Sequence, residues 1–537
     1  MAIVGLRDII FLCFCGIIHF IYRRRQKRLL PLPPSLPGWP IVGNTFQLPL
    51  KYVHVFYQDL ERKLGSKVMY AEALGQPIIA INDARIASDL LEKRSAFYSS
   101  RPRSPMYEVI GWIQFFVLLP HTDEWRNQRR IFQQHFAKRD LPREQEKALE
   151  FMHKALLPNL YQTPQDFRNH VKEFVGGMAL SMTYGLPVRR NHEPLINLSE
   201  EAFHSAVLAA APGGYWVNIL PFLQHIPDWV PGIPFKKDAQ RFREQLSRVL
   251  EEPFQMSQKN TDEGVGQECF VSSSIENYKD RSAYETLEPL VKKAASQVFG
   301  AASETTVTAL LTFILAMLIH PEFQRKAQEE IDLVVGTDRL PDFSHRSELP
   351  YLTAILKEVL RWNPVLPTGK GTNSCNLLAS SWSVIIGIPH YATADDVYEG
   401  YYIPKGATII ANAYAMLHDE EVFPNPKEFN PGRFIKDGVL VEDILDPTVT
   451  ATFGFGRRVC PGAHIALSTL YIAIASILSL FDISPALDEN NKPIEVKPEF
   501  IADSLVSEPL PFLCKITPRH GKDIDGLLAG NMNVEYL

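Results

Sequence analysis

The sequence predicts a mainly α-helical protein with minor β structure, folded as a single large helical domain around a long central helix. Residues 287–319 form a helical stretch that is longer than an average globular helix and apolar on most of its surface, as expected of a helix that runs through the middle of a large domain. Apolar side chains recur at helical spacing through much of the first half of the chain. No repeat, low-complexity tract or linker divides residues 45–520, so we expect these residues to form one domain.

Composition excludes several classes of protein. The 537 residues carry a formal net charge of −6, with 46% hydrophobic and 22% charged residues, values that exclude a disordered, collagen-like or polytopic membrane chain. The mild acidity gives no indication of nucleic-acid binding, which needs clustered Lys and Arg. Six cysteines without a CxxC pair argue against both a disulfide framework and a structural zinc site, and favour a reducing compartment.

Residues 1–22 predict a transmembrane anchor. The run 9–22 is apolar except for His19, and residues 1–6 lengthen it to a minimal membrane span. Five of the next six residues are basic, which predicts that the rest of the chain lies on the cytosolic side. A cleaved signal peptide is the alternative, but it would carry its charges before the apolar run.

The segments that flank the domain have distinct compositions. Residues 23–44 predict a basic, proline-rich linker, because five prolines within Pro31 to Pro40 favour a stiff extended spacer. Residues 521–537 contain Gly and Asn and are expected to form a flexible tail.

Within the domain, local patterns predict the following elements in chain order. Helices are expected over 53–64, 123–138 and 145–161, a β-like run over 77–81, and a surface loop over 259–267. Pro321 ends the long helix, two further helices cover 321–335 and 349–363, and a last one covers 462–481 after a turn-rich region.

The most specific segment is Phe453-Gly-Phe-Gly-Arg-Arg-Val-Cys-Pro-Gly462. A lone Cys460 directly before a helix is placed where the helix N-terminus and loop amides favour a thiolate. Gly454, Gly456 and Gly462 would let the backbone approach a flat partner closely. Phe453 and Arg458 could pack on, and neutralise, an amphipathic dianionic cofactor.

This pattern, FxxGxRxCxG, resembles the haem-binding loop of the cytochromes P-450, the haem-thiolate monooxygenases. The resemblance implies that Cys460 is the axial ligand of haem iron, that Arg458 meets a haem propionate, and that Phe453 packs near the ligand sulfur. In such proteins the thiolate favours O–O cleavage. The chain is similar to fungal microsomal members of the O-methylsterigmatocystin oxidoreductase-like group.

Two further motifs occur in the family's order. Glu358-Val-Leu-Arg361 matches ExxR, an i, i+3 pair on one helix face. Together with Arg433 in Phe429-Asn-Pro-Gly-Arg433-Phe it resembles the buried ion network that holds the family's core together. We assign these three residues a structural role.

The segment Ala301-Ala-Ser-Glu-Thr-Thr306 resembles the family's oxygen-activating segment within the long helix. Small residues would leave room above the haem, and the Thr305 hydroxyl can bond back to a carbonyl one turn earlier. The resemblance implies that Glu304 relays protons and that Thr305 stabilises the activated oxygen. Ala302 stands where the family usually has Gly.

Two matches concern the haem propionates. Trp125-Arg-Asn-Gln-Arg129 resembles the WxxxR of a helix that contacts a propionate, with both side chains on one face. His390 in Ile388-Pro-His390 resembles the basic residue of a strand that reaches a propionate.

Residues 370–387 depart from the family. Removing these 18 residues (387 − 369) restores an ordinary LPTG-IPHYA turn. Gly-Lys at the start can be encoded with a GTAAG splice donor and Ile-Gly at the end with an AG acceptor, so we predict a retained intron. A genuine surface insertion is the alternative, since loops tolerate added length; sequencing the transcript decides between them.

The resemblance therefore implies a monooxygenase of the endoplasmic reticulum membrane that inserts one atom of O2 into a hydrophobic small molecule. Its cofactor would be haem b, and because the chain has no dinucleotide fingerprint, electrons would come from a separate NADPH–cytochrome P-450 reductase, with cytochrome b5 as a further donor. Arg457 and nearby basic residues would dock the acidic reductase. By analogy, five segments would line the substrate pocket: 105–116, 203–222, 296–301, 365–368 and 504–507.

Two alternatives stay open at this point. A haem-thiolate isomerase or dehydratase would need no O2, although such relatives often lose the acid–alcohol pair that Glu304 and Thr305 retain. If residues 370–387 are translated, the chain could instead be a membrane protein without competent haem.

Overall fold

The computed structural model describes residues 30–49, 52–189, 193–210, 215–218, 220–227, 230, 234–276, 281–367, 388–501 and 506–529. The predicted anchor, residues 23–29 of the linker, the predicted insertion and residues 530–537 of the tail lie outside these ranges.

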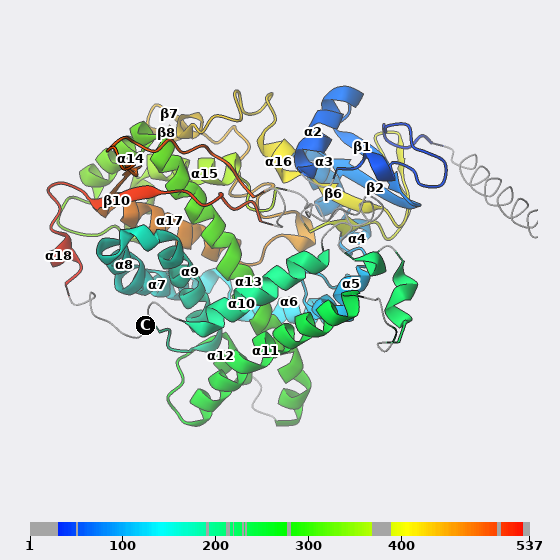
Figure 1. The fold of residues 1–537 in the computed structure, drawn as a ribbon, viewed down its shortest axis with the longest axis horizontal. Coiled ribbons are helices and arrows are strands. Elements are labelled where there is room, and N and C mark those ends of the chain that lie inside the picture. Colours follow the sequence, from blue (N-terminus) through cyan, green and yellow to red (C-terminus); the bar gives the residue numbers. More distant parts are fainter. Residues whose placement is uncertain are drawn as a thin grey trace, which may run out of the picture.

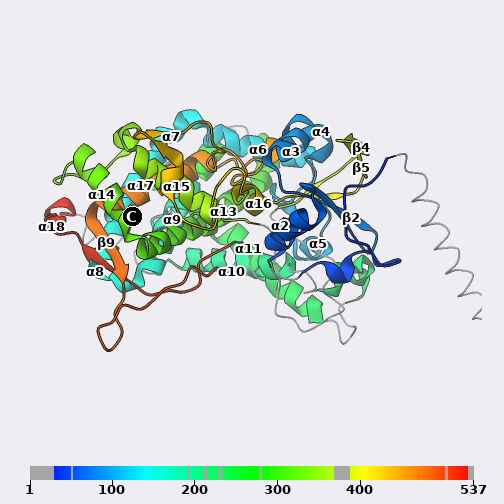
Figure 2. The same ribbon diagram turned by 90° about the horizontal axis from the view of Figure 1, so that it is seen from above.

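A large helical part and a small β part lie side by side (Figures 1 and 2). The helical part contains α6 (Asp123–His135), α7 (Leu141–Phe151), α8 (Leu157–Gln162), α9 (Phe167–Tyr184), α10 (Pro194–Ala210), α11 (Pro234–Asp262), α12 (Phe270–Glu276), α13 (Arg281–Ile319), α14 (Pro321–Val334), α15 (Pro350–Trp362), α17 (Ala463–Leu480) and α18 (Ile524–Leu527). The prediction of a mainly helical domain with minor β structure is confirmed.

The β part is built on a four-stranded sheet of order β1-β2-β6-β3. Strands β1 (Val68–Ala73) and β2 (Gln76–Ile81) form an antiparallel hairpin, β2 pairs in parallel with β6 (Thr408–Ala411), and β3 (His390–Tyr391) pairs antiparallel with β6. Five helices lie in the same half of the molecule as this sheet in Figure 1: α2 (Val53–Leu64), α3 (Ala84–Ser88), α4 (Ser95–Tyr98), α5 (Pro105–Ile110) and α16 (Ala413–Leu417). The short pairs are β4 (Asp396–Tyr398) with β5 (Tyr401–Ile403), β7 (Ile435–Lys436) with β8 (Val439–Leu440), and β9 (Phe481–Pro485) with β10 (Cys514–Pro518).

The long helix α13 passes through the centre of the domain, as predicted (Figure 1). Its C-terminal turns, residues 307–319, are mostly apolar, and Leu310, Phe313 and Ile314 have no exposed surface. It packs along α9 and also contacts α6, α10, α15 and α17. A helix segment that is mostly apolar needs such neighbours on every face, so α13 is the element from which the site can be placed.

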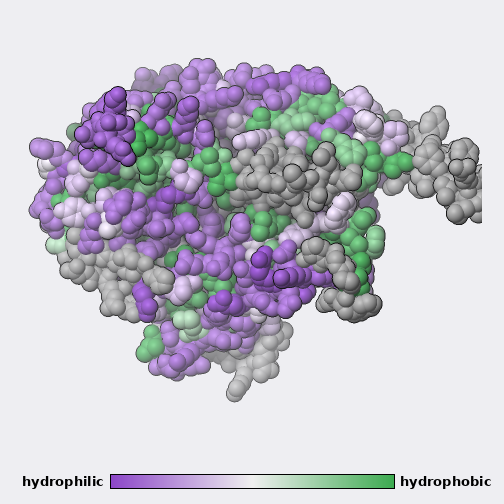
Figure 3. Space-filling model, viewed as in Figure 1, coloured by the Kyte–Doolittle hydropathy of each residue, from purple (hydrophilic) through white to green (hydrophobic). Residues whose placement is uncertain are grey.

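Helices α13 and α17 are long and apolar enough to cross a membrane, but most of each lies inside the domain, 78% and 72% of the most apolar window being buried. They are therefore core helices. The face in Figure 3 is mostly hydrophilic outside the grey atoms, with hydrophobic residues in separate groups, as expected of a domain whose apolar helices are inside.

Several predicted boundaries need correction. The long helix begins at Arg281, not at residue 287, and includes Pro289. Helix α11 continues to Asp262, so the first four residues of the predicted loop 259–267 are helical. The chain leaves the helix just before Gly264, which takes a left-handed conformation (φ 72°). The predicted helix 145–161 is two helices, α7 and α8, joined by a π-helical turn over Met152–Leu156, which accommodates Pro158 in the first turn of α8.

The tail is shorter than predicted. Residues 521–529 are folded onto the domain, because α18 buries Ile524 and Leu528 in the main hydrophobic core. Two apolar side chains four residues apart on one helical face are enough to hold this end.

Candidate active site

A cavity of about 1080 Å³ lies between α13 and the loop that precedes α17. It collects residues from distant parts of the chain, and most of its lining is apolar or aromatic. Many of the residues named from the sequence line it, among them Trp125, Arg129, Ala301, Thr305, His390, Phe453, Arg458 and Cys460. The motifs therefore meet at one place although they span more than 300 positions.

The cysteine loop is closed by its own backbone. The Cys460 N–H donates to the Phe453 carbonyl at 2.8 Å, and the Val459 N–H donates to the Gly456 carbonyl at 3.1 Å. Gly462 follows as the N-cap of α17. This geometry holds the Cys460 side chain toward the cavity, from which it is accessible.

The Cys460 thiol has opposing influences on its charge. Burial in the protein raises its pKa, whereas the Gly462 N–H and the Arg129 guanidinium lower it. A helix N-terminus and a cation are the features that favour a cysteine thiolate. The loop is thus suited to a thiolate that is stabilised further by a bound cation.

Gly456 does not line the cavity, contrary to the role we expected for it. It has a φ of 57°, and a Cβ there would lie 2.1 Å from the Leu91 carbonyl oxygen. The glycine is needed because the loop packs against the backbone of the π-helical turn Asp89–Lys93. Gly454 and Gly462 do line the cavity.

Arg458 is held rigidly at the cavity wall. Its Nε donates to the Ser99 carbonyl at 2.6 Å, Nη1 to the Phe116 carbonyl at 2.9 Å and Nη2 to the Leu119 carbonyl at 2.7 Å. Burial, with a contribution from Arg129, lowers its pKa to about 9. The guanidinium is held by backbone carbonyl groups, and no carboxylate among the described residues neutralises it.

Trp125 and Arg129 come from α6, as predicted. Thr122 caps this helix by accepting from the Trp125 N–H, and Asp123 and Glu124 occupy its first turn. The Trp125 ring lies 4.6 Å from the Arg458 Cζ, and its buried Nε1 has no hydrogen-bond partner. Arg129 donates to the Val459 carbonyl at 2.8 Å, and burial lowers its pKa.

The sequence analysis missed Arg101. Its Nη1 donates to the Ile388 and Pro389 carbonyls at 2.6 and 2.8 Å, its Nε donates to the Val117 carbonyl at 3.0 Å, and it lines the cavity. Burial and the nearby Arg458 lower its pKa strongly. No local spacing relates Arg101 to residues 288 positions away, so only the fold reveals its place.

His390 lies on β3 beside these arginines. Its Nδ1 donates to the Tyr98 carbonyl at 2.8 Å, which leaves Nε2 for a cavity ligand. Burial, Arg101 and Arg458 hold the pKa of His390 well below its usual range, so the imidazole is neutral until an anion binds beside it.

Arg101, Arg129 and Arg458 form a cationic cradle. In the part of the chain that the structure describes, none of the three forms an ion pair with a carboxylate; the acids that would raise their pKa are missing from their surroundings. Buried charges without a partner are costly. An orphaned Trp125 N–H, three uncompensated guanidiniums and a thiol facing one cavity fit the two propionates and the iron of haem.

The α13 segment 301–306 places both of its threonines at the cavity, but not Glu304. Thr305 lines it and its hydroxyl donates to the Ala301 carbonyl at 3.0 Å, as predicted from the motif. Glu304 does not line it. Its charged neighbours are Glu200 on α10, Lys172 on α9 and Glu508, and Lys172 pairs with Glu200 at 3.0 Å.

Glu304 has an unusual acidity. Burial, followed by Glu200, raises its pKa to about 7, with Lys172 lowering it and Glu508 raising it less. A carboxyl group that titrates near neutrality can both release and accept a proton at pH 7. Glu304 directly precedes Thr305 on α13, so a group that can exchange protons at pH 7 is adjacent to the threonine that lines the cavity.

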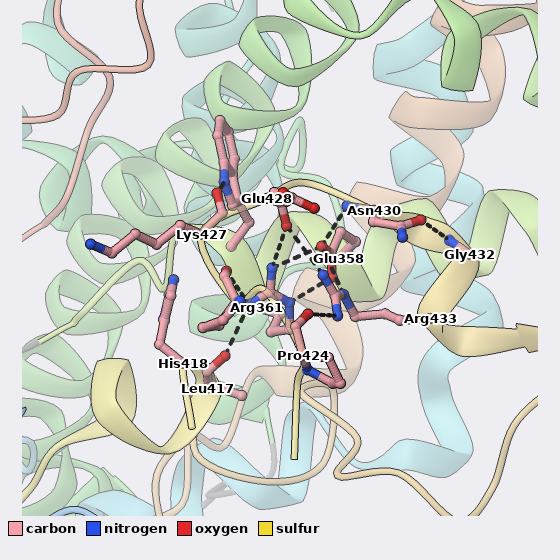
Figure 4. Close-up of polar contacts among 12 residues, drawn as sticks. Glu358, Arg361, Leu417, His418, Pro424, Lys427, Glu428, Asn430, Gly432 and Arg433 are labelled. Atoms are coloured by element: carbon pink, nitrogen blue, oxygen red, sulfur yellow. Dashed lines mark hydrogen bonds and ion pairs between the residues drawn. The ribbon is translucent and has the colours of Figure 1, made fainter. Parts of the chain in front are cut away.

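Glu358 and Arg361 form a fully buried ion pair on α15 (Figure 4). Arg361 Nε and Nη2 donate to the two Glu358 oxygens at 2.7 and 2.8 Å. Further donations from Arg361 reach the carbonyls of Leu417, Pro426 and Glu428 at 3.0, 2.8 and 3.1 Å.

Arg433 completes this network. Its Nε donates to Glu358 Oε1 at 3.2 Å, and the Asn430 N–H donates to the same oxygen at 2.7 Å. Arg433 Nη1 also donates to the Pro424 carbonyl at 3.0 Å. The three residues meet as the resemblance implied, and none of them lines the cavity.

Four of the five expected pocket segments contribute to the cavity wall: residues within 105–116, 203–222, 296–301 and 365–368. In the fifth segment, 504–507, the structure describes only Val506 and Ser507. Both are buried, and neither lines the cavity.

Comparison with known proteins gives a consistent result. The family described as Cytochrome P450 matches residues 33–372 and 381–516, and the gap between these two ranges, 373–380, falls inside the predicted insertion. A cytochrome P450 monooxygenase of Armillaria gallica is 38% identical over 94% of this chain and 96% of its own length. The monooxygenase ple1 of Rhodocybe pseudopiperita is 39% identical over 94% and 92%, and the tryptamine 4-monooxygenase of Psilocybe cyanescens is 33% identical over 95% and 97%.

Proposed function

Because the chain belongs to the cytochrome P450 family of monooxygenases, we propose that it hydroxylates or epoxidises a hydrophobic small molecule with O2. The observation that carries the proposal is the position of Cys460, which lines the same large cavity as Thr305 and the cationic cradle. The family implies haem with a cysteine thiolate ligand.

The chain's own residues would hold the cofactor from two sides. Cys460 would be the ligand of the iron, and Arg101, Arg129, Arg458, Trp125 and His390 would bind the propionates. Bound haem supplies the redox chemistry that cleaves O2 and oxidises the substrate. Phe453 would pack against the sulfur side, where an apolar neighbour limits access of water.

Protons would reach the site through α13. Glu304, with a pKa of about 7, would accept a proton from the side of Lys172 and Glu200 and pass it toward Thr305. The Thr305 hydroxyl, which donates to Ala301, would hold the last water molecule in position. This pair supports oxygen chemistry over the isomerase alternative, which needs no proton delivery to oxygen.

Electrons would come from a separate NADPH-dependent reductase, with cytochrome b5 as a further donor. Arg126, Arg130, Lys138 and Arg457 are exposed on α6 and the loops next to Cys460, and a cationic face of this kind favours an acidic partner. Residues 1–22 would anchor the protein in the endoplasmic reticulum membrane with its catalytic domain in the cytosol.

The substrate would be a polyketide, a terpenoid, a steroid-like molecule or an aromatic compound. The apolar and aromatic cavity lining supports this range, as do fungal relatives, one of which is named for tryptamine.

The test is the absorption spectrum of the reduced, CO-bound protein, made with and without residues 370–387. We expect the strongly red-shifted Soret band of thiolate ligation in the shortened protein and its loss in the Cys460→Ser variant. A folded short form that lacks the band would overturn the haem assignment. A band of equal intensity in both forms would show that the insertion is a tolerated loop and not a retained intron.

A further inference from the structure

A second buried polar network lies behind the cavity wall, and all its members are uncharged. Asn363, the C-cap residue of α15, is 5% exposed. Its Nδ2 donates to Thr312 Oγ1 at 2.9 Å and to the Ser507 carbonyl at 2.6 Å, and its Oδ1 accepts from Ser507 Oγ at 2.7 Å. Both amide hydrogens and the amide oxygen of Asn363 are therefore used.

At one end, the network supports the wall from behind. The Ser507 N–H donates to the Val365 carbonyl at 2.9 Å. Val365 and the next residue, Leu366, line the cavity, whereas Ser507 does not. The C-terminal segment 506–513, which begins beside Ser507, is thus bonded to the chain immediately behind this part of the wall.

At the other end, the network reaches the central helix α13. Residues 307–319 contain only two polar side chains, Thr308 and Thr312. Thr312 Oγ1 donates to the Thr308 carbonyl at 2.8 Å, and Thr308 Oγ1 donates to the Glu304 carbonyl at 3.0 Å. Asn363 is therefore bonded to the helix that carries Thr305, about two turns further along.

The chemistry of the network favours a geometric role. Burying an amide and hydroxyl groups costs free energy unless each of them is hydrogen-bonded, and a leucine at position 363 would fill a similar volume without that requirement. Hydrogen bonds are directional, whereas apolar packing is not. A fully bonded polar network in the core therefore specifies one relative placement of the three segments that it joins.

We propose that Asn363 is a positioning residue, which fixes the cavity wall at Val365 relative to Thr305. It does so by bonding α13 at Thr312 and the C-terminal segment at Ser507. Asn363 itself does not line the cavity, so it acts on a bound molecule only through the wall. The inference rests on the proposed monooxygenase function, in which this wall would contact the substrate.

Two ligands of haem iron test the positioning: imidazole, which is too small to reach far from the iron, and bifonazole, which carries a bulky biphenyl group. Binding to the haem-loaded protein is measured as the Soret shift of the ferric enzyme. In Asn363→Leu the wall must be ordered when bifonazole binds, so its dissociation constant should rise roughly fivefold or more, while that of imidazole stays the same. An unchanged ratio of the two constants would overturn the proposal.

Gln324→Leu is the matched control. Gln324 on α14 is 4% exposed, and its amide donates to the Ile483 carbonyl at 3.0 Å and accepts from the Ile483 N–H at 2.9 Å. Neither residue lines the cavity. The control should lower the denaturation midpoint, as Asn363→Leu does, but leave the ratio of dissociation constants unchanged. An equal rise of that ratio in both variants would show general loosening of the domain and would contradict positioning by Asn363.

Two milder variants keep the proposal testable if Asn363→Leu does not fold. Ser507→Ala and Thr312→Val each remove one partner of the Asn363 amide, so each should raise the same ratio by a smaller factor. Where Asn363→Leu folds, adding Ser507→Ala to it should cause little further change, because both substitutions remove the same hydrogen bond. Wild-type ratios in both milder variants would refute the assignment.

Hydrogen exchange gives a readout that does not depend on haem. The amide of Ser507 is protected by its bond to Val365, so we expect faster exchange at 506–508 in Asn363→Leu and wild-type exchange there in Gln324→Leu. Equal exchange at 506–508 in wild type and Asn363→Leu would contradict the proposal.

The CO-bound spectrum separates the proposed function from the role of Asn363. If wild type lacks the band of thiolate ligation, the proposed function fails. If the band is normal in wild type and in all variants but the ratio of the two dissociation constants does not change in Asn363→Leu, only the positioning role fails.

Discussion

Two regions of this protein bury arginine side chains, and they treat the charge in opposite ways. In the network on α15, Arg361 and Arg433 both bind Glu358, which has no exposed surface. In the cationic cradle, Arg101, Arg129 and Arg458 are held by backbone carbonyls, and no described carboxylate pairs with them. The first region is complete as folded, whereas the second is complete only when an anion binds.

This difference separates a structural element from a binding site without reference to any relative. A network whose charges neutralise one another is important for folding because the loss of any one member leaves a buried charge without a partner. An uncompensated cluster is retained at a cost in stability because its ligand supplies the missing charge. Mutations should therefore affect folding in the first region and ligand retention in the second.

The largest effect is expected for Glu358→Ala. It leaves two buried guanidiniums without a carboxylate and should cost about 3–5 kcal/mol of unfolding free energy. Since a domain has only about 5–15 kcal/mol in total, thermal denaturation and the yield of folded protein should both fall sharply. A variant with the wild-type melting temperature would show that the network is not a structural element.

In the cradle, Arg129→Leu should leave folding nearly intact and weaken haem retention. The variant removes one charge-assisted donor, a loss of about 1.5–3 kcal/mol, which corresponds to roughly a 10- to 100-fold faster haem release. Transfer of haem from the loaded protein to an acceptor protein measures that rate. Unchanged release, or unfolding as severe as in Glu358→Ala, would remove the distinction between the two regions.

Glu304 is a third case, a buried group that avoids the cost of charge by staying protonated. Its pKa is about 7 in the folded protein and near the ordinary value of 4.5 in the unfolded chain. The stabilisation that the protonated Glu304 gives the folded state is therefore complete below pH 4.5 and is lost as pH rises through 7. The loss is at most about 3 kcal/mol, and less because solvent screens part of it.

The measurement compares Glu304→Gln with wild type in denaturant titrations at pH 5 and pH 8. The variant should be relatively more stable at pH 8 than at pH 5, because it lacks the titrating group. Lys172→Met should steepen the wild-type dependence, since Lys172 lowers the pKa of Glu304. A pH-independent difference would contradict the raised pKa.

The smallest effect is expected at an exposed pair with the same spacing as Glu358 and Arg361. Asp59 and Arg62 are also i, i+3 neighbours on one helix, 3.5 Å apart, but their side chains are 63% and 56% exposed. Asp59→Ala should change the unfolding free energy by less than about 1 kcal/mol, and less still in high salt. A loss comparable to that of Glu358→Ala would mean that burial is not what makes the network important.

The sequence determined those features whose information is local. The cysteine loop, the pair Glu358 and Arg361, and Thr305 are contained in short motifs, and helices such as α2, α14 and α15 were predicted almost to the residue because their apolar spacing and flanking prolines or glycine act within one or two turns. Local spacing could not place the ends of every element. It missed the boundary between α7 and α8 within 145–161 and the end of α11 within 259–267.

The tertiary structure decided which residues meet. Arg101 joins the cradle through carbonyls almost 300 positions away, and Gly456 is required by a contact with Leu91. Glu304 does not line the cavity, and its pKa is influenced by Lys172 and Glu200 from two other helices. These facts depend on how separate elements pack. Local propensity acts over a few residues, whereas burial and charge compensation depend on neighbours that only the folded chain brings together.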